Sequence, residues 1–127
     1  MRRWAPVLLA ALAAGCGGES GDLLAIEVSG GPQGTDRTIV VTGDGRGRCD
    51  GGELQPISNQ QLIDARELER ELTELDEEER RFGGGEGRSY VARARDGALR
   101  WSEGTEPKPE LLPRLELLAL QLGRELC

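Results

Sequence analysis

The chain has 127 residues with 23 acidic and 16 basic side chains, a formal net charge of −7, three cysteines and no histidine. This acidic balance argues against binding to nucleic acids, because it would repel their phosphate backbone. The lack of histidine removes the most frequent general base and metal ligand, and no other catalytic constellation stands out, so we expect no enzyme, no cofactor and no metal site.

The N-terminus has the pattern of an export signal. Arg2 and Arg3 precede an uncharged apolar run at residues 4–14, which is shorter than the ~20 residues that a membrane-spanning helix needs. The run ends in small residues placed directly before a cysteine, in the order Leu12-Ala13-Ala14-Gly15-Cys16. This ending resembles the lipobox of bacterial lipoprotein precursors. The resemblance implies a signal peptide at residues 1–15 and lipid attached to Cys16.

Two other interpretations of this segment stay open. An ordinary signal peptidase could cut at Ala-x-Ala or nearby and leave Cys16 as a thiol, and Arg2-Arg3 could belong to a twin-arginine export signal. In the lipoprotein interpretation, residues 16–21 are a lipidated cysteine with a flexible tether, and residues 22–127 are a single domain. The protein would then lie on the extracytoplasmic face of the cell membrane, held through the lipid on Cys16.

The segment after residue 15 is more acidic than the whole chain. It carries all 23 acidic residues and 14 of the 16 basic ones, a formal charge of −9. Such a charge disfavours adsorption on anionic headgroups. We therefore expect the lipid, and not the protein surface, to hold the domain at the membrane.

The two remaining cysteines, Cys49 and Cys127, would reach an oxidising compartment together. A disulfide between them closes a loop of 78 residues and fixes the last residue of the chain. The chain-entropy model gives such a loop a stabilisation on the order of 4 kcal/mol. Two free thiols are the alternative, but neither has a histidine or a motif cysteine beside it that would make it a nucleophile.

Strands are predicted on both sides of a central helix. Residues 23–28 and 37–42 are the first two, and the run 46–49 could pair after the tight turn Gly43-Asp44-Gly45. Further along, residues 89–95 and 98–102 alternate around Asp96-Gly97, a pair that favours a two-residue hairpin loop. This alternation puts Tyr90, Ala92 and Ala94 on one face, and Leu99 and Trp101 on one side of the returning strand.

The first helix should begin at a capping box formed by Ser58 and Gln61. An apolar stripe follows at steps of three and four residues, made of Leu62, Ala65, Leu68, Leu72 and Leu75. We expect the helix to stop only before Gly83, with Asp76–Arg80 and Glu77–Arg81 as ion pairs at the favourable spacing. The dense carboxylates on its other face fit a solvated surface without catalysis.

The second helix should run from about Glu110 to Leu126, with Pro113 tolerated because it lies in the first turn. Its stripe consists of Leu111, Leu115, Leu118 and Leu122, widened by Leu112, Leu117, Ala119 and Leu120. The predicted order is β-β-(β)-α-β-β-α. It indicates an α+β domain with a small antiparallel sheet of about four strands and two helices packed on it.

Two motifs contain residues of the kinds that ligand-binding loops use. Asp44 to Asp50 has carboxylates near glycines, but arginines occupy two of the positions where a calcium loop needs oxygen ligands, so a plain turn is favoured. The glycines of 29–34 have neither the spacing of a phosphate-binding loop nor a helix after them.

The turn Ser29-Gly30-Gly31, with Gly34, and the order of elements around it resemble emfourin-type proteins, small bacterial inhibitors of thermolysin-like metalloproteases. The cysteines and the lipobox are not part of that pattern, and no site residue is carried over from it. We expect a membrane-anchored lipoprotein with a small non-catalytic binding domain and an envelope protein as its partner. The resemblance implies the alternative, inhibition of a secreted thermolysin-like metalloprotease.

Overall fold

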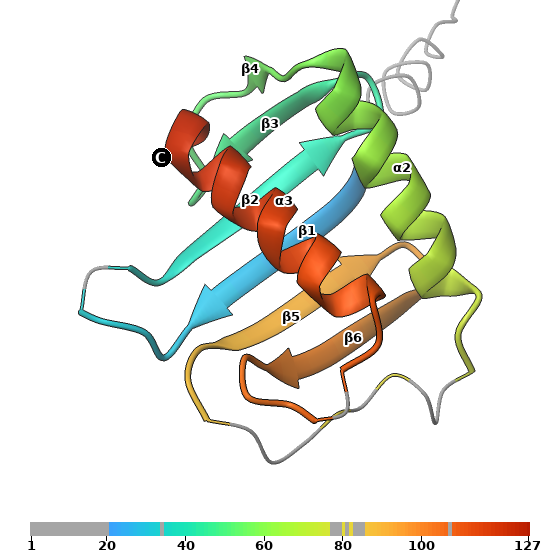
Figure 1. Cartoon of the computed structure of the whole chain (residues 1–127). Coiled ribbons are helices and arrows are strands. Elements are labelled where there is room, and N and C mark those ends of the chain that lie inside the picture. The colour runs from blue at the N-terminus through green and yellow to red at the C-terminus, as the bar shows by residue number, and fades with distance from the viewer. Residues whose placement is uncertain (1–20, 34, 77–79, 81, 83–85, 107) are drawn as a thin grey trace, which may run out of the picture.

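Two helices cover one face of a six-stranded antiparallel sheet in the computed structural model of the chain (Figure 1). The structure describes residues 21–33, 35–76, 80, 82, 86–106 and 108–127, so the predicted signal peptide and Cys16 lie outside the described residues. The elements are β1 (Asp22–Ser29), β2 (Arg37–Thr42), β3 (Arg46–Cys49), β4 (Gln55–Pro56), α2 (Asn59–Thr73), β5 (Ser89–Ala94), β6 (Gly97–Ser102) and α3 (Leu111–Leu126). Among the described residues no helix is long and apolar enough to cross a membrane.

The predicted α+β class is confirmed, with a sheet of six strands instead of about four. The strand order is β4-β3-β2-β1-β5-β6, so the first strand lies inside the sheet, between β2 and β5. The additional strands are short, and β4 has only two residues. After β4, a backbone hydrogen bond from Ile57 N–H to Gly45 O continues the pairing with the segment before β3. The chain then passes from the sheet into α2.

The core lies between the sheet and the helices. Leu24, Ile26 and Val28 alternate along β1 toward the helices, as the period of two requires. The other buried side chains come from every larger element: Ile39, Val41, Ala65, Leu68, Leu72, Tyr90, Ala92, Leu99, Trp101, Leu111, Leu112, Leu115, Leu118, Ala119 and Leu122. The core is therefore largely aliphatic, with the two aromatic rings at one end.

The predicted capping box starts α2. The Ser58 hydroxyl accepts from Gln61 N–H at 3.1 Å, and Gln61 Oε1 accepts from Ser58 N–H at 2.9 Å. The predicted end of this helix is wrong, because α2 ends at Thr73 and does not continue toward Gly83. Leu75 still packs against the core from outside the helix.

Arg80 explains why the helix ends early. Its guanidinium donates to Thr73 O at 3.3 Å and its Nε donates to Leu75 O at 3.1 Å, so it satisfies carbonyls at the helix end. Asp76 and Arg80 lie beyond the end of α2, so they are not a pair at helical spacing on this helix. The Glu77–Arg81 pair and Gly83 fall outside the described residues.

The β5–β6 hairpin forms as predicted, but its loop is one residue earlier. Ala94 pairs with Gly97, so the two loop residues are 95–96 instead of Asp96-Gly97. This register places Tyr90 opposite Trp101, and their rings stack 5.0 Å apart with an interplanar angle of 7°. Both aromatic rings thus lie against the helices, where the stacking stabilises this register.

The last helix, α3, begins at Leu111, so Pro113 lies in its first turn as predicted. The predicted stripe is buried, but Leu117 and Leu120 are 54% and 51% exposed, so the widening of the stripe is wrong at these two positions. Both lie outside the buried face through which α3 packs. The helix runs diagonally across the sheet and ends beside β3 (Figure 1).

The chain terminus is attached to the sheet at that point. Cys127 lies at disulfide distance from Cys49 at the end of β3, with an S–S distance of 2.00 Å and a Cα–Cα distance of 5.4 Å. Leu126 packs against Gly47, which lies two residues before Cys49 on the same strand. A β-carbon on Gly47 would lie 2.9 Å from Leu126 Cδ1, so this strand position accepts the helix end only without a side chain.

Candidate functional site

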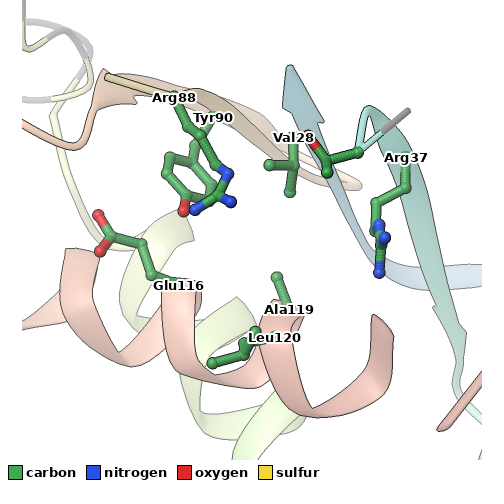
Figure 2. A pocket seen from close by; sticks show the side chains of 8 residues that line it. Val28, Arg37, Arg88, Tyr90, Glu116, Ala119 and Leu120 are labelled. Carbon is green, nitrogen blue, oxygen red and sulfur yellow. The ribbon is translucent and has the colours of Figure 1, made fainter. Parts of the chain in front are cut away.

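A pocket opens between α3 and the strand ends that flank the β1–β2 loop (Figure 2). It encloses about 120 Å³. Its walls combine an apolar floor with five polar side chains and are formed by Val28, Thr35, Arg37, Arg88, Tyr90, Glu116, Ala119 and Leu120. Figure 2 shows Arg88 and Arg37 on opposite sides of the pocket, with Val28 between them and Ala119 and Leu120 below.

Arg88 is held in place by the acidic side chain of the next loop. Glu103 accepts from Arg88 N–H at 2.9 Å through Oε1 and lies 3.4 Å from Arg88 Nη1 through Oε2. On its other side, Arg88 packs against the backbone of Gly31. A β-carbon on Gly31 would lie 2.7 Å from Arg88 Nε, so the guanidinium occupies its place because residue 31 has no side chain.

Arg37 lies at the other side of the pocket, against α3. A β-carbon on Gly123 would lie 2.7 Å from Arg37 Nη1, which shows how closely the guanidinium approaches the helix. Among the described residues no carboxylate lies within 4.0 Å of the Arg37 guanidinium. Its charge is therefore not neutralised by an ion pair in that part of the chain.

Tyr90 and Glu116 form the inner wall. Burial raises the pKa of Tyr90, and the negative charges of Glu116 and Glu103 raise it further, while Arg88 opposes them. The hydroxyl therefore stays protonated at neutral pH and remains a hydrogen-bond donor. Glu116 Oε2 accepts from Trp101 Nε1 at 2.7 Å and from Lys108 Nζ at 2.8 Å, so this carboxylate is fixed by two donors.

The arrangement suits a small carboxylate. Two guanidinium groups and a phenolic donor surround the opening, and arginine binds carboxylates through two parallel hydrogen bonds. The apolar floor would accept a short aliphatic stem beside the charged group. Pockets for larger organic ligands usually enclose ~300 Å³ or more, so this one fits a side chain or a chain terminus better than a cofactor.

Neither of the two predicted site residues that the structure describes lines this pocket. Cys16 is outside the described residues, and Cys49 and Cys127 are not among the residues that line the pocket. The pocket residues were missed because no local motif joins them: they come from β1, the β1–β2 loop, β2, the start of β5 with the residue before it, and α3. The one available signal was Gly31 in the Ser29-Gly30-Gly31 turn, where the lack of a side chain admits Arg88.

Asp44 and Asp50, the two carboxylates of the loop that was compared with a calcium site, have hydrogen-bond partners within the protein. Asp44 accepts from the Thr42 hydroxyl and from Arg46, and these two bonds lower its pKa, with the hydrogen bond from Thr42 the larger cause. Asp50 Oδ1 accepts from Thr38 N–H at 2.8 Å. In the part of the chain that the structure describes, no group of acidic or cysteine residues is arranged to hold a metal ion.

Comparisons with protein families, with curated proteins and with solved structures gave no match to this chain.

Proposed function

We propose that this chain is a bacterial envelope lipoprotein, anchored through Cys16, whose domain is a non-catalytic binding module. Its pocket would take a carboxylate of a partner protein, either an acidic side chain or a C-terminus. The observation that carries the proposal is the placement of Arg37, without an ion-pair partner among the described residues, across a small pocket from Arg88. A buried or half-buried arginine without a partner carboxylate is expected to gain from binding one.

The charges in the pocket support binding more than catalysis. Its ionisable groups are two arginines, a tyrosine with a raised pKa and a carboxylate held by two donors. General acid–base catalysis works best with a group whose pKa lies near the working pH. Tyr90 does not meet that condition, because its pKa is raised, and Glu116 already accepts from Trp101 and Lys108.

The test uses a small carboxylate as a probe. N-acetylglycine is titrated into the oxidised domain, residues 21–127, and amide shifts are followed by NMR at Gly31, Arg88 and Ala119. We expect saturation with a Kd on the order of 1 mM, since one carboxylate in a small site supplies about 4 kcal/mol of binding free energy. N-acetylglycinamide, which has the same shape without the charge, should cause no saturable shifts.

Matched variants separate the pocket from the general surface. Replacing Arg37 and Arg88 together by glutamine should abolish the shifts, while Arg70→Gln on the exposed side of α2 should leave them unchanged. Equal responses to the acid and the amide, or binding that survives loss of both pocket arginines, would reject the carboxylate site.

A second candidate function is inhibition of a secreted thermolysin-like metalloprotease. It is favoured by the β1–β2 loop, which extends past the end of the sheet in Figure 1 and lies beside the pocket. Thr35 ties this loop to Pro32 through its backbone and side chain, which would keep a protruding segment in one conformation. Titration against a panel of such proteases tests it: stoichiometric inhibition supports the candidate, and full protease activity at excess protein rejects it.

A further inference from the structure

The face of the sheet that the helices do not cover carries a set of arginines. Residues directly opposite each other on paired strands share a face, and the pairs define one row across five strands: Arg48, Val40, Ala25, Arg93 and Ala98. Ala25 alternates with Leu24 and Ile26, which point to the helices, so this row lies on the open face. The next row holds Thr38, Glu27, Val91 and Arg100.

These two rows contain three arginines and one carboxylate. Glu27 forms an ion pair with Arg93. Arg48 and Arg100 have no carboxylate within 4.0 Å among the described residues. Arg46, two residues before Arg48, lies on the same face and is paired with Asp44 at 2.9 Å. These rows of the open face therefore carry an excess of positive charge, with Asp50, bonded to Thr38, as a further carboxylate at their edge, although the protein as a whole is acidic.

The helix layer has the opposite balance. In α2, four carboxylates outnumber two arginines, and Glu74 follows at the helix end. In α3 the two signs are equal, with Glu110 at the start of the helix. A surface that looks uniformly acidic from composition is thus divided by the fold, with excess positive charge on the sheet and excess negative charge on the helices.

The proposed attachment through Cys16 keeps both charged faces of the domain close to the membrane. The described chain begins at Gly21, and only four residues separate it from Cys16, or five peptide units in all. A fully extended chain covers at most ~3.6 Å per residue, so the tether can hold the domain no more than about 20 Å from the lipid. At that distance the charged faces of the domain lie within or near the range of the surface potential of anionic lipids.

We infer that the domain rests with its open sheet face, through Arg48, Arg93 and Arg100, on the anionic headgroups of its own membrane. The inference depends on the proposed lipid anchor. In this orientation the helices and the carboxylate pocket face away from the membrane, where a partner can reach them. An acidic protein segment is the competing occupant, but the short tether favours the lipid surface.

The test is arginine footprinting of the full chain, purified as the lipidated protein. It is reconstituted into vesicles of phosphatidylcholine with or without phosphatidylglycerol, and phenylglyoxal modification is read by mass spectrometry. We expect modification of Arg48 and Arg100 to slow more than about fivefold on the anionic vesicles, since each basic side chain near such a surface favours the bound state by about that factor. Arg70 and Arg124 on the helices serve as controls and should not change.

Other readouts in the same experiment decide between explanations. The protection should disappear in about 1 M salt, where the screening length is ~3 Å. A double variant, Arg48→Gln with Arg100→Gln, should remove the protection of Arg93. Equal rates on both vesicle types, or protection of the helix arginines, would overturn the inference.

The anchor is checked separately, because the mass of the N-terminal peptide shows in the same digest whether Cys16 carries lipid. A lipidated chain without protection refutes the orientation and leaves the anchor standing. A chain without lipid refutes both. Protection of Arg48 and Arg100 by polyglutamate in solution, with none from the anionic vesicles, would assign the face to an acidic protein and overturn the membrane orientation.

Discussion

Gln61 Nε2 in the first turn of α2 donates to Glu125 Oε2 in the last turn of α3, across 3.0 Å. The same Gln61 closes the capping box with Ser58, and its side chain is only 8% exposed. One residue thus caps one helix and connects it to the end of the other, close to the Cys49–Cys127 pair.

A double-mutant cycle should detect this connection. We expect Gln61→Ala to lower the free energy of unfolding by about 1–2 kcal/mol, since it removes a capping bond and a hydrogen bond to a charged group. The coupling with Glu125→Ala should be about 0.5–1 kcal/mol in denaturant titrations. Gln60→Ala is the control, because the hydrogen bond of Gln60 is an exposed one to Asp64 within the same helix. A coupling of zero would show that the bond between the helices does not form.

The Cys49–Cys127 pair closes a covalent loop with a sequence separation of 78 residues. Cys49→Ser should lower the free energy of unfolding by on the order of 4 kcal/mol, because it releases a loop of 78 residues in the unfolded chain. Melting curves with and without reductant measure the effect, and Cys127→Ser should match Cys49→Ser. Identical melting of the wild-type protein in both conditions would contradict the prediction.

Tyr90 is the only tyrosine, so phenolate absorbance reports its ionisation alone. In the folded protein its titration midpoint should lie above 10, since burial and Glu116 raise the pKa, and it should return to about 10 in denaturant. Glu116→Gln should bring the midpoint closer to 10 but not to it, because burial is the larger cause.

The raised pKa of Tyr90 determines how its ionisation changes the stability of the fold with pH. The folded state keeps its proton where the unfolded state loses it, so this contribution to stability is complete below pH ~10 and is lost as the pH rises through the folded pKa. Tyr90→Phe should reduce that loss in denaturant titrations at alkaline pH. A folded midpoint at or below 10 would contradict the burial of the hydroxyl.

Gly31 should be needed for the position of Arg88. In Gly31→Ala, the new β-carbon would lie 2.7 Å from Arg88 Nε and force the guanidinium to move, so we expect N-acetylglycine to bind at least several-fold more weakly. Gly43→Ala is the matched control, because no atom lies within 4 Å of the added carbon there. Equal losses in the two variants would indicate a general effect on stability instead.

The lipid anchor rests on Cys16. Cys16→Ala should move the protein from the detergent phase to the aqueous phase in a phase-partitioning assay, because it removes the acylated thiol. The Cys49→Ser variant, made in parallel, should stay in the detergent phase. Unchanged partitioning of Cys16→Ala would reject the lipoprotein interpretation.

Several features of the fold could be predicted because they depend on neighbours in the chain. The capping box of Ser58 and Gln61, the first-turn position of Pro113 and the burial of alternate residues in β1 each involve bonds or periodicities within a few residues. The pairing of Cys49 with Cys127 could be predicted from the number of cysteines and from the predicted oxidising compartment. The binding pocket could not be predicted in this way.

What only the tertiary structure decided involves residues far apart in sequence. The end of α2 depends on Arg80 reaching back to Thr73, and the hairpin register places Tyr90 opposite Trp101. The pocket joins Arg37 on β2 with Arg88, the residue before β5.

The charge pattern shows the same division. The sequence by itself determined the net charge, the covalent loop and the local start of each helix, because these depend on composition or on adjacent residues. Only the packing of the sheet decided that Arg48 and Arg100 share an open face while the carboxylates of α2 lie on the other side. Strand pairing brings residues that are distant in sequence onto one face of the sheet. The net charge from composition does not show on which face each charge lies.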